Sequence, residues 1–495
     1  MRIANLKRCL IITGLSCLFA FTTAKAQNYP NLDSSLHKFA VTELASDFTY
    51  FKALLEKAHP SLYRYTTKDS MDHYFAEALS KLDHPMNQIQ FWQILQGDVI
   101  DKIKCGHTII NPSQSYADKY GRIKHPLLPF FIYIKDDHIF VRAYLGKKDS
   151  TINLDDEVLA INNETAQQLL QELRPLVSGD GYTNSFKNFQ LETGRFNAFY
   201  WRLHSTENSF TILFKSADGS TITKTIQPLI VNATADSSLH QNSDGQDAKG
   251  ILPPNDSLHS ISYPSDIPQT AWVKISSFMY SDGLDFDTKL FKELEKNNIQ
   301  NLVIDLRNNT GGMNSGPIDL LKYLLPKDFY YIKEQYTVVD TSEFKALCYA
   351  KSSSPVDPMT ILPLIQHQVY TLNYLTDGLQ NPYKHTFKGK VYVLINDGTF
   401  SAGSLFATAL KEQSNCKLYG QETGGNLGGC DAGTLRYIIM PKTFLRLYIP
   451  FYWDSSASTA ANTGVGLKPD VEVPLSSRDM FYPMIRTAIN SSASK

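Results

Sequence analysis

Two apolar segments, each followed by a glycine-containing turn, constrain the fold of this chain most strongly. "NLVIDLR" (301–307) leads into "NNTGG", and "VYVLIN" (391–396) leads into "DGTFSAGS". Runs without polar alternation are typical of strands that are buried on both faces of a parallel sheet. Amphipathic helical patterns lie at 285–298 and 402–413. This alternation predicts an α/β domain with a mostly parallel sheet over residues 267–480.

The turn after the second segment places Ser401 where a strand gives way to a helix. At this position a serine can be a nucleophile, because the free N–H groups of a helix N-terminus can hold a developing oxyanion. It can equally be a helix N-cap with no chemistry, and this stretch alone leaves both readings open. Gly311 and Gly312, in the turn after the first segment, would allow a tight turn that directs another N–H to the same point.

The residues before this domain predict three further segments. Apolar residues at helical spacing predict a helical domain over 27–115, which ends at "KCGHTIINP". A strand-rich region over 120–232 begins with a hairpin pattern, "FFIYIKDDHIFVRAYL". Residues 233–266 are polar and rich in Ser, Asp, Asn and Pro, which predicts a linker or loop.

Part of the strand-rich region, "INLDDEVLAINNETAQQLLQEL", is similar to the core of a PDZ domain, in which a turn precedes a strand and then a helix. Asp155-Asp156 stands where that family has Gly-Asp. A PDZ-like groove would bind an extended peptide by strand addition. The alternative is that the region only packs between the helical domain and the sheet.

The N-terminus has the pattern of a cleaved signal peptide. A basic start, the apolar run "CLIITGLSCLFAFTT" and an A-x-A site ending at Ala26 predict processing after residue 26. The apolar run is shorter than the roughly 20 residues of a membrane span. We therefore expect a periplasmic or secreted protein with no membrane span after cleavage. A net charge of -1, without long charged runs, gives no support for nucleic-acid binding.

The cysteines and histidines do not predict a metal or cofactor site. Four cysteines remain after the signal peptide: Cys105, Cys348, Cys416 and Cys430. They are too scattered for a disulfide scaffold, and the sequence does not decide whether two of them form one disulfide. There is no H-E-x-x-H motif and no Cys/His cluster at ligand spacing along the chain.

Taken together, the blocks "WVKISSF", "NLVIDLRNNTGG", "VYVLINDGTFSAGSLFATAL", "LYGQETGG" and "GVGLKPDVEV" resemble the tail-specific, or C-terminal processing, serine peptidases and their tricorn-like relatives. Those enzymes carry L-R-x-N-x-G-G, S-A-x-E, G-x-x-T-x-G and G-[VI]-x-P-D motifs in this order. The resemblance implies a multidomain α/β protein, in which a helical N-terminal domain and a PDZ-like domain precede a ClpP/crotonase-like protease domain.

The resemblance also implies roles for individual residues. Ser401 falls on the family's nucleophile, and Ser404, where the family has Glu, is a rival. The N–H of Ala402 and that of Gly311 or Gly312 would form the oxyanion hole.

The general base depends on the branch of the family. One branch uses a lysine after the G-x-x-T-x-G turn, but Asn426 stands there. The tricorn-like branch uses a histidine near the end of the helical domain, which is His107 here.

Two departures from the tricorn-like pattern affect the partners of this histidine. Gly106 stands in place of a serine, and Thr463 in place of a glutamate. Three carboxylates in neighbouring turns are candidates to orient the imidazole: Glu422, Asp431 and Asp454.

The sequence therefore predicts a serine endopeptidase that hydrolyses peptides or proteins through a Ser401–His107 acyl-enzyme mechanism without a metal or cofactor. One alternative is a catalytically silent protein that binds peptides or hydrophobic ligands, since the same fold occurs in a retinoid-binding protein. Another is an esterase with the same nucleophile.

Overall fold

The structure is a computed structural model, and it describes most of the chain after residue 36. Described are residues 37–493, except 121–122, 146–151, 205–208, 233–257, 280–282, 341, 344–365, 372–377, 434–436, 461–463 and 474–479. The predicted signal peptide, Thr463 and Cys348 lie outside these residues. None of the described helices combines the length and the apolar character that crossing a membrane requires.

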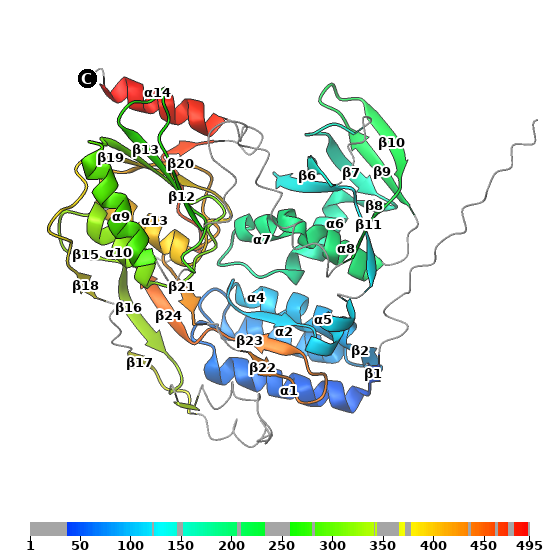
Figure 1. The fold of residues 1–495 in the computed structure, drawn as a ribbon. Helices are drawn as coiled ribbons and strands as arrows, with labels where there is room; N and C mark the ends of the chain where they lie inside the picture. The colour runs from blue at the N-terminus through cyan, green and yellow to red at the C-terminus, as the bar shows by residue number, and fades with distance from the viewer. Residues whose placement is uncertain are drawn as a thin grey trace, which may run out of the picture.

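The C-terminal half is built on a six-stranded sheet, seen in Figure 1 beneath helix α14 (Phe481–Ala493). Its order is β12 (His259–Ser262), β13 (Thr270–Ile275), β14 (Asn301–Asp305), β19 (Lys390–Ile395), β20 (Lys417–Gly420) and β25 (Val471–Glu472). All neighbouring strands are parallel except the β12–β13 pair. The prediction of a mostly parallel sheet is confirmed. The prediction of a loop over 233–266 was wrong at β12, because this short polar segment pairs with the exposed edge of β13.

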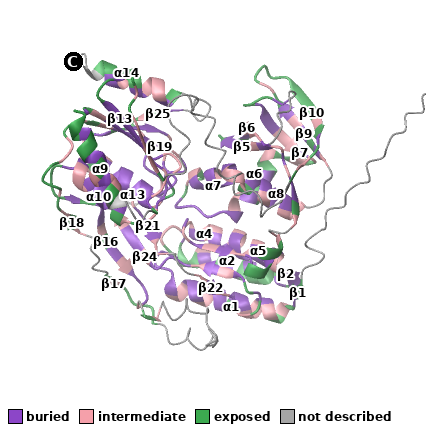
Figure 2. Cartoon of the chain, in the orientation of Figure 1, coloured by how far each residue is buried: buried purple, intermediate pink, exposed green. Residues whose placement is uncertain are grey.

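Helices cover both faces of this sheet, which explains its apolar strands. Helices α9 (Gly283–Lys296), α10 (Ser315–Leu324) and α13 (Ala402–Gln413) share one core with Leu302 and Ile304 of β14. Val303, between them, points to the other face and packs with α14 (Phe481–Ala493). Figure 2 shows the resulting buried layer.

The N-terminal part consists mainly of helices. It contains α1 (Val41–Ala58), α2 (Lys68–Ser80), α3 (Gln88–Gln93), η2 (Ile94–Ile100) and α4 (Asp101–Ile103), with a small β1–β2 pair (Lys38–Phe39, Met86–Asn87). In α1, Leu44, Phe48, Phe51 and Leu55 are buried together, as their helical spacing requires. Helix α4 is capped at its C-terminus by Lys104, whose φ of 60° turns the chain into Cys105-Gly106-His107.

The middle region contains antiparallel strands, including the hairpin that the sequence pattern predicts. They are β4 (Lys124–Leu127), β5 (Phe130–Lys135), β6 (His138–Tyr144), β7 (Glu157–Ile161), β8 (Glu164–Thr165), β9 (Phe210–Lys215), β10 (Thr221–Ile226) and β11 (Leu229–Asn232). Asp136 and Asp137 have φ values of 50° and 61°, the positive angles that a two-residue type I′ hairpin turn requires. Helix α6 (Ala166–Leu173) follows β8.

The same region also contains helices that the strand-rich reading missed. These are η3 (Arg174–Leu176), α7 (Ser185–Gln190), η4 (Leu191–Arg195) and α8 (Phe196–His204). Aromatic residues spaced three or four apart in "SFKNFQLETGRFNAFYWRLH" give this segment a helical period, and its large rings are mostly buried.

A late hairpin joins the two halves of the molecule. Strands β22 (Ile438–Ile439) and β23 (Arg446–Tyr448) form a sheet with β3 (Ile109–Asn111), in which Tyr448 pairs with Ile109. In Figure 1 the orange hairpin lies against the blue helical part.

The remaining elements are α5 (Gln114–Tyr120), a β15–β18 pair (Phe329–Tyr330, Leu379–Gln380), and a four-stranded sheet of β17 (Tyr370–Thr371), β16 (Ile332–Thr337), β24 (Tyr452–Ser456) and β21 (Gly429–Ala432).

Candidate active site

Ser401 lies on a strained turn between β19 and α13. Its backbone has φ 51° and ψ −126°, a conformation that a non-glycine residue adopts only when its surroundings impose it. The turn is held against the end of β14: Thr399 Oγ1 donates to Leu306 O at 2.9 Å, and Asn396 Nδ2 donates to Asn308 Oδ1 at 2.8 Å. Strained residues of this kind cluster at functional sites.

The hydroxyl of Ser401 faces His107. Its Oγ lies 3.0 Å from His107 Nε2, across 294 residues of sequence. The Ser401 side chain makes no capping hydrogen bond to helix α13. The reading of Ser401 as a simple N-cap is therefore wrong, and the structure places a hydroxyl and an imidazole at hydrogen-bond distance.

The imidazole of His107 is stacked and largely shielded from water. Its ring lies 4.9 Å from that of Phe400, the residue before Ser401, with an interplanar angle of 25°. Burial lowers the pKa of His107 to about 4, so the ring is neutral at physiological pH. The Nδ1 atom is buried and has no hydrogen-bond partner among the described residues.

Gly311 and Gly312 bring a second turn to the same point. Gly311 has φ 100°, and a Cβ there would lie 2.8 Å from Ser401 Cβ and 2.9 Å from Ala402 N, so only glycine fits. However, the Gly311 N–H already donates to Asn309 Oδ1 at 2.9 Å. Of the expected oxyanion donors, the N–H groups of Ala402, at the N-terminus of α13, and of Gly312 donate to no other backbone group among the described residues.

The two alternative residues of the sequence interpretation face elsewhere. Ser404 is buried, and its hydroxyl donates to Ser401 O at 2.9 Å. Asn426 Nδ2 donates to Tyr65 Oη, and Asn426 Oδ1 accepts from Gly428 N at 2.8 Å. Neither side chain is bonded to the hydroxyl of Ser401.

None of the three carboxylates expected to orient His107 bonds to its ring. Glu422 accepts from Gly466 N at 2.7 Å, and Asp431 accepts from Ser61 Oγ at 2.7 Å. Asp454 accepts from the side-chain amides of Asn314 and Gln335. Each carboxylate thus bonds to groups outside the dyad that are distant in sequence, which the sequence could not reveal.

A fourth carboxylate, Asp180, was missed by sequence reasoning. It is 6% exposed and accepts the N–H of Gly106 at 2.6 Å, one residue before His107. It lies between η3 and α7, in the helical segment that the sequence reading treated as strand-rich. The run "SGDGY" carried no signal beyond that of a polar turn.

One buried group near the site has the residue types of a metal site. Ligand-capable atoms of His59, Cys105 and Asp431 lie within 4.8 Å of one another, a proximity that their sequence spacing hides. Their polar atoms already have partners: His59 Nε2 pairs with Thr108 Oγ1 at 2.7 Å, and Asp431 accepts from Ser61. Burial lowers the pKa of His59 to about 3 and raises that of Asp431 to about 6. The group fits a buried hydrogen-bond network.

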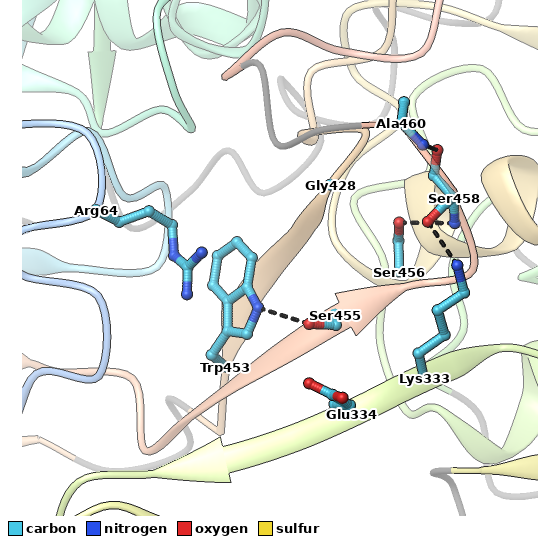
Figure 3. A pocket seen from close by; sticks show the side chains of 9 residues that line it. All are labelled: Arg64, Lys333, Glu334, Gly428, Trp453, Ser455, Ser456, Ser458 and Ala460. Carbon is cyan, nitrogen blue, oxygen red and sulfur yellow. Dashed lines mark hydrogen bonds between the residues drawn. The ribbon is translucent and has the colours of Figure 1, made fainter.

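A separate hollow lies beside β24, drawn in Figure 3. It has a volume of about 290 Å³, and its walls include Arg64, Lys333, Glu334 and Trp453. The Arg64 guanidinium stacks 3.6 Å from the centroid of the Trp453 ring. Neither Ser401 nor His107 lines this hollow.

A serine hydroxyl beside a neutral imidazole, at the N-terminus of a helix, is the arrangement of serine-nucleophile hydrolases. Residues 269–473 match the family model of peptidase family S41, so this part of the chain is similar to that family.

Two curated proteins and one solved structure illustrate the similarity. The chain is 24% identical over 226 residues to carboxyl-terminal-processing peptidase 3, chloroplastic, of Arabidopsis thaliana, covering 46% of this chain and 36% of that protein. It is 34% identical over 89 residues to the carboxy-terminal processing protease CtpB of Bacillus subtilis (strain 168), covering 18% of each. The chain thus spans little more than a third of the first relative and less than a fifth of the second. The structure of mature CPAF complexed with lactacystin aligns over 92% of this chain and 98% of its own, with a TM-score of 0.64 and 14% identity, a likeness of fold.

Proposed function

We propose that this protein is a periplasmic or secreted serine endopeptidase that hydrolyses peptide bonds through a Ser401–His107 acyl-enzyme mechanism. The observation that carries the proposal is the 3.0 Å separation of Ser401 Oγ and His107 Nε2 at the N-terminus of α13. The location rests on the signal-peptide pattern of residues 1–26.

In the proposed reaction, the neutral His107 accepts the Ser401 proton as the hydroxyl attacks a peptide carbonyl. Ala402 N–H and Gly312 N–H hold the developing oxyanion, and one such donor contributes about 3–4 kcal/mol to lowering the barrier. The imidazolium then protonates the leaving amine, and water releases the acyl-enzyme.

The surroundings of Gly312 suit a peptide substrate. Met279 and Met313 are 57% and 55% exposed, and both follow residues that pair across the Phe278–Gly312 bridge. Flexible thioether side chains adapt to varied apolar groups. We further propose that the β-rich region of 120–232 is PDZ-like and presents peptides to this site.

A fluorophosphonate probe tests the proposal, because it labels only an activated serine. The intact protein should be labelled and should cleave a protein substrate, and Ser401→Ala should lose both, with a fall in kcat/KM of roughly 10⁶-fold. Ser404→Ala is the matched control and should retain both.

Each alternative has its own outcome. A folded protein that is never labelled would be a binding protein. Labelling with ester turnover but no peptide turnover would identify an esterase. Labelling that survives Ser401→Ala and disappears in Ser404→Ala would move the nucleophile to Ser404.

A further inference from the structure

The segment 177–182 runs alongside the turn that carries His107. Ser178 Oγ donates to Thr108 O at 2.5 Å, and Gly181 N donates to Lys104 O at 2.9 Å. Between these two bonds, Gly106 N donates to Asp180 Oδ1 at 2.6 Å. Three hydrogen bonds therefore fix the backbone on both sides of the imidazole.

The same segment reaches the loops that surround Ser401. Tyr182 N donates to Gly464 O at 2.7 Å, and the N–H of Asn426 also favours the charged form of Asp180. The neighbouring Gly425 packs on the nucleophile turn, since a Cβ at Gly425 would lie 3.1 Å from Ser401 N. The Asp180 carboxylate thus lies between the backbone that carries His107 and the backbone that packs on Ser401.

We propose that Asp180 is a positioning residue, whose carboxylate holds the Cys105-Gly106-His107 turn so that Nε2 meets Ser401 Oγ. The inference rests on the proposed peptidase function and deepens it. Asp180 acts through the backbone of Gly106, because the imidazole Nδ1 has no hydrogen-bond partner among the described side chains.

Tight packing transmits the position of Gly106 to the imidazole. A Cβ on Gly106 would lie 2.5 Å from Phe400 Cζ and 3.1 Å from Asp180 Oδ1, so both side chains pack closely on this glycine. Phe400 stacks on His107 and also on Phe186, with centroids 3.8 Å apart in the second pair. A shift at Asp180 or Gly106 therefore displaces the ring that supports His107.

The charge of Asp180 changes close to neutral pH. Burial, and then the nearby Asp431, raise the pKa of Asp180 to about 7, against the opposing effect of the Gly106 and Asn426 N–H groups. Two buried thiols, Cys105 and Cys430, also lie within electrostatic range, and their own pKa values are raised well above the ordinary range.

Protonation of Asp180 removes the charge from its hydrogen bond to Gly106. A charge-assisted hydrogen bond is stronger than a neutral one, so the turn is held less firmly below pH 7. We therefore expect kcat to fall on the acid side with an apparent pKa near 7, well above the value of about 4 for His107 itself.

The test is Asp180→Asn in the full chain, because the amide oxygen keeps the shape and one acceptor but cannot ionise. At pH 8, kcat should fall roughly tenfold or more while KM changes little. The kcat limb near pH 7 should disappear, leaving only the imidazole limb. Asp47→Asn is the matched control: Asp47 is buried and accepts the N–H groups of Lys442 and Thr443, and this variant should keep the limb near 7.

Unchanged kcat and an unchanged limb in a folded Asp180→Asn protein would overturn the inference. If that variant does not fold, the intact enzyme decides: a kcat that is flat between pH 6 and 8 also overturns it. A limb near pH 6 that persists in Asp180→Asn and disappears in Asp431→Asn would assign the titration to Asp431 and reject Asp180. Loss of cleavage in Ser401→Ala, measured in parallel, keeps the peptidase function separate from this result.

Discussion

The two halves of the candidate dyad are built in different ways. Ser401 and its oxyanion donors come from two strand–turn units of one parallel sheet, whose turns are joined by hydrogen bonds such as that from Thr399 Oγ1 to Leu306 O, 93 residues apart. His107 comes from the end of the helical domain and is held by partners far along the chain: Asp180, 74 residues from Gly106, and strand β23, which pairs with β3. The nucleophile side thus lies within one sheet, whereas the base side depends on contacts between the helical part, the middle region and the hairpin that contains β23.

The largest expected effect comes from removing the base. His107→Ala should lower kcat/KM roughly 10⁶-fold, about as much as Ser401→Ala, because residues that act as a unit are not additive. The double variant should lose little more than either single variant. Asn426→Ala, which changes the position where one branch of the family has lysine, should retain most of the activity in a peptide-cleavage assay.

A comparable loss in Asn426→Ala would contradict this assignment of the base. The pH profile of kcat/KM gives an independent check. Because burial lowers the pKa of His107 to about 4, the limb that belongs to the imidazole should lie below the usual value of about 6.5.

Sequence reasoning succeeded where structure is local. The apolar runs at 301–306 and 391–395 predicted buried parallel strands, and the turn after each of them meets the other at Ser401 and Gly311. The hairpin at 130–144 also followed from local pattern and turn residues. In each case the residues of the strand or turn itself carry the signal for its local structure.

Sequence reasoning failed where partners are distant. The carboxylates chosen to orient His107 were selected for lying in neighbouring turns, yet Glu422, Asp431 and Asp454 each bond elsewhere. Asp180 gave no signal, because its role depends on a fold that brings 177–182 against 104–108. The strand-rich reading of this region also hid the helices on either side of Asp180.

The second prediction concerns a substitution that weakens the packing of the base side without changing a catalytic group. Leu447 of β23 is fully buried and pairs with Ile110, three residues after His107. Leu447→Ala should lower the free energy of unfolding by about 2–5 kcal/mol. Hydrogen exchange should become faster at the amides of β3, because the cavity lies beside this strand. The amides of β19 should be affected less.

The matched control is Leu418→Ala, on the nucleophile side. Leu418 is fully buried in β20, which pairs with β19, so its removal should speed exchange in β19 and spare β3. If both variants loosen β3 and β19 equally, the two sides unfold as one cooperative unit, and the contrast between them does not extend to stability.

The smallest expected effect concerns a buried carboxyl on the nucleophile side that has no contact with the dyad. Asp287 of α9 lies near Asp319 of α10, and burial, together with the charge of Asp319, raises the pKa of Asp287 to about 8. The folded state therefore favours protonated Asp287, whereas the unfolded chain releases the proton near pH 4. Its contribution to stability is present below pH 4 and is lost as the pH rises through 8. Asp287→Asn cannot ionise, so it should be less sensitive to alkali and more stable than the natural protein at pH 8–9, by roughly 1–2 kcal/mol.

Thermal unfolding across pH 5–9 measures this difference, and parallel curves for the two proteins would contradict it. The kcat profile should not change, in contrast to Asp180→Asn. Burial thus raises the pKa of both Asp287 and Asp180. For Asp287 the raised pKa is only a cost of burial, whereas the proposed positioning role of Asp180 follows from its hydrogen bond with Gly106.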